Sequence, residues 1–380
     1  MIIGIDINSI PYGTGVSNYT LNLVKNLIKI DKVNTYKLFF TSKGLSFPKS
    51  LEKLQSFPNV TIYYYKLPLR FFEIVWNTLH FFPIELFIGQ CDIFHTSDWT
   101  HPPTRRAKTI CTIHDLTPFI NPEWHSHKII VNHQTKMRHA ATSAAHFICV
   151  SENTRSDLFK IFPQVDPAKT SVIYEAAENK YHQFNRLQPS VRHKKIALLK
   201  NHYELDNYFL AQGTREPRKN LHRLIEAFRQ FCLRHPDTTA KLAIAGKYGW
   251  GEDVAKNDPN VRLLGYVKES DMVTLHAGAK ALVYPSLYEG FGLPVVKSLK
   301  VGVPVITSNL SSLPEIARGA AILVDPYSVE SISQALSQVY FDQSLRRHLI
   351  ETGLQVARHY NWAKTARQTL KIYYRVASST

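Results

Sequence analysis

Short segments rich in β-branched and aromatic residues alternate with helix-like segments along almost the whole chain, and this alternation occurs in two series. The strand-like segments of the first series are 2–7, 36–41, 60–65, 92–95, 108–114 and 146–151. Those of the second series are 208–213, 241–246, 261–265, 281–285, 303–307 and 321–325. Such alternation predicts parallel sheets that are covered by helices on both faces.

The two series are separated by a polar segment, residues 179–206, in which the alternation stops. We therefore place a domain boundary near residue 182, and a chain of 380 residues is long enough for two domains. The expected fold is α/β, with two doubly wound, Rossmann-like domains facing a cleft. In such sheets ligands bind beyond the carboxyl ends of the strands, so the chemistry is expected in strand-to-helix loops.

Four cysteines lie far apart and form no CxxC pair, which argues against a structural zinc site or a disulfide framework. Residues 1–7, MIIGIDI, lack the basic and long apolar regions of a signal peptide, and they are expected to form the first strand. A reduced, cytoplasmic location is the expectation that fits both features.

The formal net charge of +16 predicts attraction to nucleic acid, anionic lipid or phosphorylated small molecules. No zinc finger, RNP motif or basic heptad region is present, so nucleic acid is not expected as a partner. The most apolar segment, 67–94, is interrupted by charged residues and is not expected to cross a bilayer. It is either a core helix with an aromatic loop or a docking surface for a lipid or glycolipid acceptor at an anionic membrane, with the protein peripheral at the inner face.

Two loops of the first half carry candidate ligand groups. Gly13 and Gly15 follow the first strand, where exposed amides can approach an anion or a sugar, although a plain turn is an equal alternative. His114 ends a later strand and is followed by Asp115, so it is placed to contact a ligand. A satisfied core histidine is the alternative, and no GxSxG motif supports a hydrolase.

In the second half, the loop GTREPRKNL (213–221) carries Arg215, Arg218 and Lys219 at the start of a helix. The helix dipole disfavours cations at that position, and a bound diphosphate would explain them. Asn220 is expected to cap this helix, as Ser151 is expected to cap the helix near 152–160.

The most informative segment is YPSLYEGFGLPVVK (284–297). Its glycines would let the amides of residues 291–293 point at a phosphate at the start of a helix, and Pro294 suits the first helical position. Glu289 cannot favour a phosphate, so we expect it to accept hydrogen bonds from sugar hydroxyls. A sugar attached to a diphosphate would satisfy both halves of the loop.

These segments together resemble family 4 of the retaining glycosyltransferases, which have the GT-B architecture. The resemblance covers nearly the whole chain. It is carried by the N-terminal glycine loop, TIHDLTPF with PEWH, FICVSENTRSDL, VIYEAAE, GTREPRKNL, LLGYV, YPSLYEGFGLP, SLPEI and the helix that contains Trp362. It implies an N-terminal acceptor-side domain of 1–182, joined by a returning helix at 362–380, and a donor domain of 183–361.

The resemblance also implies roles for individual residues. Catalytic roles would fall to Lys219 and Arg218 at the diphosphate, Glu289 at the sugar hydroxyls and His114 at the transferred sugar. The implied donor-binding residues are Gly15, Gly213, Arg215, Tyr266, Val267, Gly290, Phe291, Gly292, Leu293 and Lys297. Tyr266 and Val267 resemble the segment whose backbone lies by the nucleobase. No metal or other cofactor is expected, because side chains already neutralise the diphosphate.

One position departs from the family pattern. The family places a second glutamate eight residues after the first, and this chain has Lys297 there. Three interpretations are open: Lys297 points to solvent, it contacts an extra anion such as donor phosphate or acceptor, or the protein is an inactive relative. The surviving Lys219, Glu289 and His114 argue against inactivity.

The resemblance implies transfer of a sugar from a nucleotide diphosphate sugar to a polysaccharide or lipid-linked glycan, with retention of anomeric configuration. Front-face attack, with the departing phosphate as the base, is the implied mechanism. TIHDLTPF with PEWH and VIYEAAE are most similar to mannosyl- and rhamnosyl-transferring relatives. The alternatives are a non-catalytic carbohydrate- or nucleotide-binding relative and another GT-B enzyme, such as a sugar-nucleotide epimerase or a phosphorylase.

Overall fold

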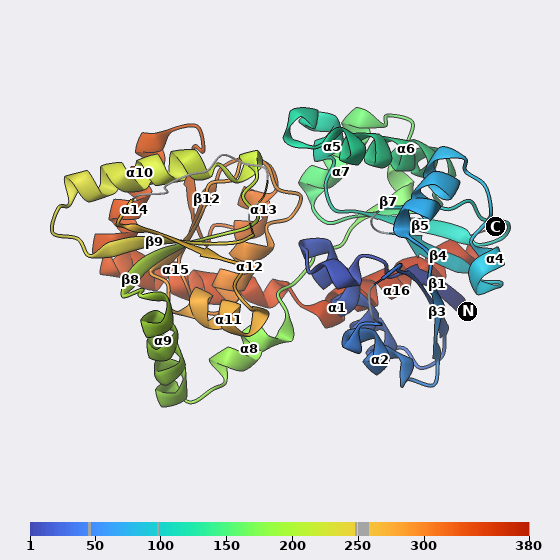
Figure 1. The fold of residues 1–380 in the computed structure, drawn as a ribbon, viewed down its shortest axis with the longest axis horizontal. Coiled ribbons are helices and arrows are strands. Elements are labelled where there is room, and N and C mark those ends of the chain that lie inside the picture. The colour runs from blue at the N-terminus through green and yellow to red at the C-terminus, as the bar shows by residue number, and fades with distance from the viewer. Residues whose placement is uncertain (45–46, 97–98, 248, 250–257, 380) are drawn as a thin grey trace. The chain divides into compact units, whose positions relative to one another are not determined.

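The structure is a computed structural model that describes residues 1–44, 47–96, 99–247, 249 and 258–379. The chain divides into two compact units (Figure 1). Unit 1 comprises Met1–Glu175 and Asn361–Thr380, and unit 2 comprises Ala176–Tyr360. Each unit is an α/β layer structure built on a parallel sheet, as the alternating pattern predicts.

Unit 1 contains a seven-stranded parallel sheet with the strand order β3-β2-β1-β4-β5-β6-β7. The strands are β1 (Ile2–Asp6), β2 (Thr35–Thr41), β3 (Val60–Tyr65), β4 (Ile93–Thr96), β5 (Lys108–Ile113), β6 (His146–Cys149) and β7 (Thr170–Val172). The order reverses between β1 and β4, so unit 1 has a topological switch point at the carboxyl ends of these two strands.

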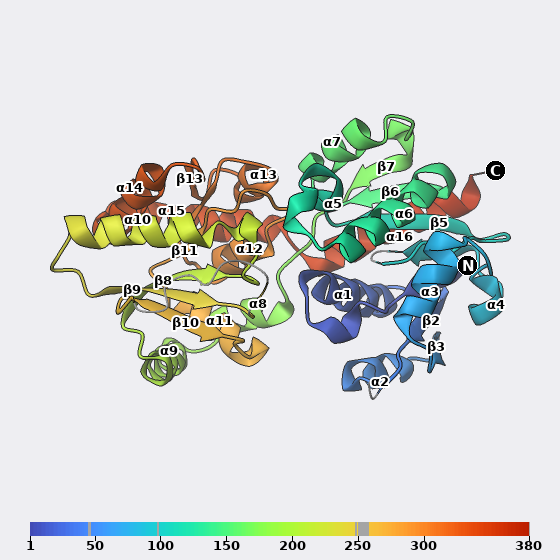
Figure 2. The same ribbon diagram turned by 45° about the horizontal axis from the view of Figure 1, so that its top comes forward.

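The helices of unit 1 are α1 (Gly15–Ile30), α2 (Lys49–Gln55), α3 (Leu69–Phe72), α4 (Glu85–Ile88), α5 (Thr117–Ile120), α6 (His127–Ser143), α7 (Glu152–Ile161) and α16 (Trp362–Ser378). The C-terminal α16 lies against α1 in both ribbon views (Figures 1 and 2). The predicted return of the last segment to the N-terminal unit is therefore observed.

Unit 2 contains a six-stranded parallel sheet with the strand order β10-β9-β8-β11-β12-β13. The strands are β8 (Asn207–Gln212), β9 (Ala240–Ala245), β10 (Val261–Gly265), β11 (Ala281–Tyr284), β12 (Val305–Ser308) and β13 (Ile322–Val324). The helices are α8 (Asn179–Asn185), α9 (Pro189–Tyr203), α10 (Leu221–Arg234), α11 (Glu269–Ala277), α12 (Leu293–Lys300), α13 (Leu313–Ala317), α14 (Val329–Phe341) and α15 (Gln343–Val356).

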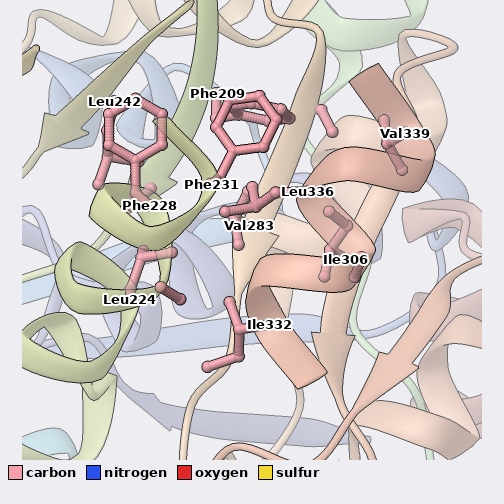
Figure 3. Packing of buried hydrophobic residues seen from close by; sticks show 14 of the residues in the cluster. Phe209, Leu224, Phe228, Phe231, Leu242, Val283, Ile306, Ile332, Leu336 and Val339 are labelled. Atoms are coloured by element: carbon pink, nitrogen blue, oxygen red, sulfur yellow. The ribbon is translucent and has the colours of Figure 1, made fainter. Parts of the chain in front are cut away.

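In unit 2, α10 and α14 lie on one face of the sheet and α9 and α11 on the other (Figure 2). Buried residues of α10 and α14, such as Phe228 and Leu336, pack against strand residues such as Phe209 and Val283 (Figure 3). Removal of this apolar surface from water is the main favourable contribution to the stability of the unit. It holds the strand ends, and the loops that follow them, in fixed positions.

Unit 2 begins at Ala176 and not near residue 183, because the polar segment 179–206 forms α8 and α9, which pack on α11. The sequence of α9 shows no apolar periodicity, because Leu199 is its one buried residue. Strand β7 was also absent from the predicted set, and it is only three residues long.

The two predicted helix caps differ in outcome. Ser151 caps α7 as expected, because its hydroxyl accepts a hydrogen bond from the amide of Thr154 at 3.0 Å. Asn220 occupies the N-cap position of α10 as expected, but its side chain makes no capping hydrogen bond. Asn220 adopts a left-handed conformation, and its amide donates to the carbonyl oxygens of Pro285 and Pro326. It ties the start of α10 to two neighbouring loops instead of capping the helix.

The segment 67–94 forms α3, a π-helical turn (Glu73–Thr78) and α4. Phe72 and Trp76 are buried in a core with Phe39. Other apolar side chains of the same segment, including Phe81, are exposed. No helix of the described residues is both long and apolar enough to cross a bilayer.

Candidate functional site

The loops after β8 and β11 meet at the switch point of the unit 2 sheet. A short 3-10 helix, Pro217–Lys219, follows β8, and the amide of Leu287 in the loop after β11 donates to the carbonyl oxygen of Arg218 at 2.8 Å. Adjacent parallel strands bring their carboxyl ends to one edge of the sheet, and this edge is where ligands of doubly wound sheets bind. The basic loop and the glycine loop therefore form one site.

At the centre of this site, Glu289 is held between two cations. Lys219 Nζ donates to Glu289 Oε1 at 2.6 Å, and Arg218 donates to Glu289 Oε2 at 2.7 Å. Lys219 Nζ also donates to the hydroxyl of Tyr284 at 2.6 Å, and Arg218 Nε donates to Glu216 at 2.9 Å. Because an ammonium has three N–H groups, Lys219 retains one donor for a ligand.

Burial and charge act in opposite directions on this cluster. Burial alone would raise the pKa of Glu289, but the charges of Arg218 and Lys219 outweigh it and lower that pKa to about 2. Burial, with the Arg218 charge, lowers the pKa of the Lys219 ammonium from its usual value. Burial and the charge of Glu289 raise the pKa of the Tyr284 hydroxyl, so that it stays protonated.

The glycine loop has a fixed backbone. Gly292 precedes α12 with φ +103°, a conformation that favours glycine, and an added Cβ would lie 2.8 Å from Leu313. The Ser312 hydroxyl is 2.9 Å from the carbonyl oxygens of both Glu289 and Phe291. Among the described residues, the amides of Gly292 and Leu293 donate no hydrogen bond. These two amides at a helix N-terminus suit an anion.

Lys297 does not point to solvent, so that interpretation of the sequence is wrong. Its side chain is 5% exposed, and its Nζ lies 3.2 Å from Glu178 Oε1. Its ammonium also lies 5.5 Å from the centre of the Tyr181 ring. The anion beside Lys297 is thus a carboxylate of the chain itself, supplied by the VIYEAAE segment.

In unit 1, His114 follows β5 and pairs with a carboxylate that the sequence did not single out. His114 Nδ1 lies 3.0 Å from Glu175 Oε1, and the Tyr19 ring packs edge-on against the imidazole at 4.6 Å. His114 Nε2 is buried and has no hydrogen-bond partner among the described residues. An N–H at Nδ1 that donates to Glu175 would leave Nε2 as an acceptor for a ligand hydroxyl.

The remaining candidate residues are divided between the units. Gly15 opens α1 in unit 1 and is exposed. In unit 2, Gly213 lies against Lys219, and Arg215 is buried in the same loop. After β10, Tyr266 is exposed under the ammonium of Lys247, whereas Val267 is buried. Across the described ranges, no group of three or more His, Cys, Asp or Glu side chains is arranged to hold a metal ion.

The structure therefore brings together Arg218, Lys219, Glu289 and the loop 290–293. Sequence reasoning missed the partners Tyr284, Glu175 and Glu178, and also Ser311, whose hydroxyl accepts from the Glu289 amide at 3.0 Å. Three of these residues could have been found from their positions beside family motifs. Glu175 and Glu178 lie in VIYEAAE, and Ser311 directly precedes SLPEI.

Comparison with known proteins identifies the class. The family described as Glycosyltransferase Family 4 matches residues 13–178, and the family described as Glycosyl transferases group 1 matches residues 197–356. The chain is 30% identical over 383 residues to O-antigen chain mannosyltransferase B of Escherichia coli, covering 95% of this chain and 96% of that protein. The chain therefore belongs to glycosyltransferase family 4, and it is a glycosyltransferase of the GT-B fold.

Two further similarities define the extent of the match. The serotype-specific mannosyltransferase WbdA of Escherichia coli is 25% identical over 299 residues, which is 72% of this chain and 34% of that longer protein. The structure of Anabaena Alr3699/HepE in complex with UDP-glucose superposes with a TM-score of 0.71 at 16% identity, covering 99% of this chain and 100% of that chain. The second similarity concerns the fold.

Proposed function

We propose that this glycosyltransferase moves mannose, with retention of configuration, from a nucleotide diphosphate sugar to a polysaccharide or lipid-linked glycan. The observation that carries the proposal is the cluster of Lys219, Arg218 and Glu289 beside the unpaired amides of Gly292 and Leu293. Two mannosyltransferases among the relatives, one of them similar over almost its full length, support mannose over rhamnose as the transferred sugar.

The chemistry follows from the charges of the cluster. Cleavage of the sugar–phosphate bond builds negative charge on the leaving oxygen, and preorganised donors stabilise that charge most effectively. Lys219 has one N–H to offer, and the two unpaired amides at the start of α12 add further donors. Loss of one such donor typically costs about a hundred- to a thousand-fold in rate.

Glu289 has two roles in this proposal. Both of its oxygens already accept hydrogen bonds from cations. A carboxylate oxygen has more than one lone-pair site, so each can still accept from a sugar hydroxyl. Glu289 then fixes the two cations in place and orients the sugar at the same time.

The direct test is release of nucleoside diphosphate from UDP-, GDP- and dTDP-sugars, GDP-mannose among them, with and without a mannan-type acceptor. We expect acceptor-dependent release with a mannose donor, and an α-linked product would establish retention. Lys219→Met should reduce kcat by about a hundred-fold or more, whereas Lys195→Met, an exposed lysine of α9, should not. Absence of turnover with every donor would refute the proposal.

The non-catalytic alternative rested on Lys297. Because Lys297 pairs with Glu178 inside unit 2, the substitution leaves no uncompensated charge in the donor domain. We propose on this basis that the donor domain keeps its fold and its diphosphate-binding groups despite Lys297. Binding of a donor without turnover would be the result that favours the alternative.

We also propose that the protein works at the inner face of an anionic membrane. The exposed apolar side chains of the 67–94 segment are Leu67, Phe71, Ile74, Leu79, Phe81, Phe82 and Leu86. His80 and Phe82 have φ of +48° and +57°, conformations that are costly for residues other than glycine. The exposed cation Arg70 lies in this segment, and the exposed Lys66 directly precedes it.

This apolar and basic surface can be tested by co-sedimentation with vesicles. Binding should require phosphatidylglycerol, should weaken with salt and should fall when Phe81 and Leu79 are both changed to serine. Binding that is indifferent to lipid charge and to these changes would contradict membrane association.

A further inference from the structure

The C-terminal helix α16 buries polar groups that its docking alone does not require. The helix packs on α1 in unit 1 (Figures 1 and 2), and an apolar face would be enough to hold it there. Trp362, Thr365 and Tyr373 are nevertheless buried on this face, at 7%, 2% and 0% exposed. A buried hydroxyl is costly unless it is hydrogen-bonded, so the partners of these side chains show what the helix holds.

Thr365 holds the segment that carries Glu175. Its hydroxyl donates to the carbonyl oxygen of Tyr174 at 2.8 Å. Tyr174 directly precedes Glu175, and both lie after Val172, the last residue of β7. Glu175 is 4% exposed, and its Oε1 lies 3.0 Å from His114 Nδ1. The hydrogen bond from Thr365 therefore fixes the backbone next to the carboxylate that pairs with the imidazole.

The Tyr19 ring of α1 is the second side chain that contacts His114. Tyr19 is 1% exposed, and its ring packs edge-on against the imidazole at 4.6 Å. The Trp362 ring packs against the same tyrosine, with the two ring centres 5.8 Å apart. Tyr19 is therefore in contact with α16 as well as with His114.

A chain of hydrogen bonds joins the Tyr19 hydroxyl to α16. The Tyr19 and Thr112 hydroxyls lie 3.1 Å apart, and Thr112 Oγ1 lies 2.7 Å from His95 Nε2. His95 Nδ1 lies 2.5 Å from the Tyr373 hydroxyl. Burial lowers the pKa of His95 to about 3, so its imidazole is neutral and has one donor and one acceptor nitrogen. The chain then runs unbroken from α16 through β4 and β5 to α1.

We infer that α16 is a positioning element, which fixes the tautomer and the ring orientation of His114 through Glu175 and Tyr19. Glu175 keeps a proton on Nδ1, and the Tyr19 ring limits rotation of the imidazole, so that Nε2 is held as an acceptor in one direction. Buried hydrogen-bond networks of this kind rigidify the groups that they join. The role of His114 at the transferred sugar rests on the proposed function, whereas its fixation by α16 does not.

The test compares Thr365→Val with Thr369→Val in the full chain. The first change removes the hydroxyl that holds Tyr174, and the second removes a hydroxyl that donates to the carbonyl oxygen of Thr365 within the helix. Imidazole nitrogen NMR reads the tautomer at a pH at which an ordinary histidine is neutral, with His114→Gln used to assign the signal. We expect one tautomer, protonated at Nδ1, in wild type and Thr369→Val, and a mixture in Thr365→Val.

Tyr373→Phe and Tyr374→Phe form a second matched pair. Tyr373→Phe removes the hydroxyl at the end of the chain to Tyr19, whereas the hydroxyl of the exposed Tyr374 accepts from Asn34. Tyr373→Phe should shift the carbon-bound proton signals of the His114 ring, which the ring current of Tyr19 affects. Tyr374→Phe should leave these signals unchanged.

Turnover is measured on the same samples. Thr365→Val should lower kcat about five-fold, the effect of one lost hydrogen bond, with KM for the donor and the affinity for nucleoside diphosphate unchanged. Thr365→Ser, which restores the hydroxyl, should recover the wild-type kcat. A helix that only stabilised the fold would not separate kcat from donor binding in this way.

The outcomes separate this inference from the proposed function. Absence of turnover in wild type would refute the proposed function alone, since the NMR measurement does not need it. Unchanged His114 signals in both Thr365→Val and Tyr373→Phe, or a wild-type imidazole protonated at Nε2, would overturn the inference. Thr365→Ala provides the same comparison if Thr365→Val fails to fold.

Discussion

The pair formed by Lys297 and Glu178 makes a quantitative prediction about stability. At 3.2 Å and an effective dielectric constant of 20, the gross attraction between these charges is about 5 kcal/mol. Lys297→Met removes the cation and leaves Glu178 buried, with Lys180 at 3.9 Å as its remaining partner. Breaking a buried pair costs about 3–5 kcal/mol, and the remaining lysine places the expected loss at about 3 kcal/mol.

The assay is urea denaturation, followed by far-ultraviolet circular dichroism, in a double-mutant cycle of Lys297→Met and Glu178→Gln. The double variant should recover about 2 kcal/mol or more of the summed losses, because it leaves no unpaired charge. Lys297→Glu, which restores the family's second glutamate, should be more destabilising than Lys297→Met, since it sets two carboxylates side by side. A Lys297→Met variant within about 0.5 kcal/mol of wild type, with no coupling, would refute this reasoning.

Four further predictions follow from the sites. Glu175→Gln should lower kcat about ten-fold with intact folding, because the imidazole it orients loses a charged acceptor; unchanged steady-state kinetics would contradict this. Gly213→Ala should reduce kcat, since its Cβ would lie 3.1 Å from Lys219 Cε, whereas Gly319→Ala has open space and should not. Glu289 has a folded-state pKa of about 2 against an ordinary 4.5, so its contribution of about 3 kcal/mol is present above pH 4.5 and is lost as pH falls toward 2. Urea midpoints of wild type should therefore fall more steeply in acid than those of Glu289→Gln. Turnover should persist in EDTA, and its abolition, with rescue by added Mg²⁺, would refute metal independence.

Local patterns were sufficient for most of the fold. Short segments rich in β-branched, aromatic or other apolar residues, such as 60–65 and 261–265, form strands where the sequence predicts them. The basic loop and the glycine loop were recognisable because cations and glycines at a helix start have few structural uses. Their convergence follows from the sheet order, which puts β8 next to β11.

Local sequence patterns could not predict which side chains distant in the sequence contact one another. Lys297 has the charge of a surface residue, and only the fold shows that Glu178 neutralises it at the start of unit 2. Thr365 is likewise an ordinary position on a helix until α16 is packed on α1 and β4. The polar helix α9 has almost no apolar face, so its existence depends on packing against α11 and not on its own periodicity.

The most direct test of the central claim is calorimetric titration of UDP and GDP into wild type and Lys219→Met. If Lys219 and the amides before α12 hold the donor diphosphate, wild type binds at least one of these nucleotides and Lys219→Met binds it about ten- to a hundred-fold more weakly. Equal affinity in a folded Lys219→Met variant would show that the diphosphate is bound elsewhere and would contradict the account.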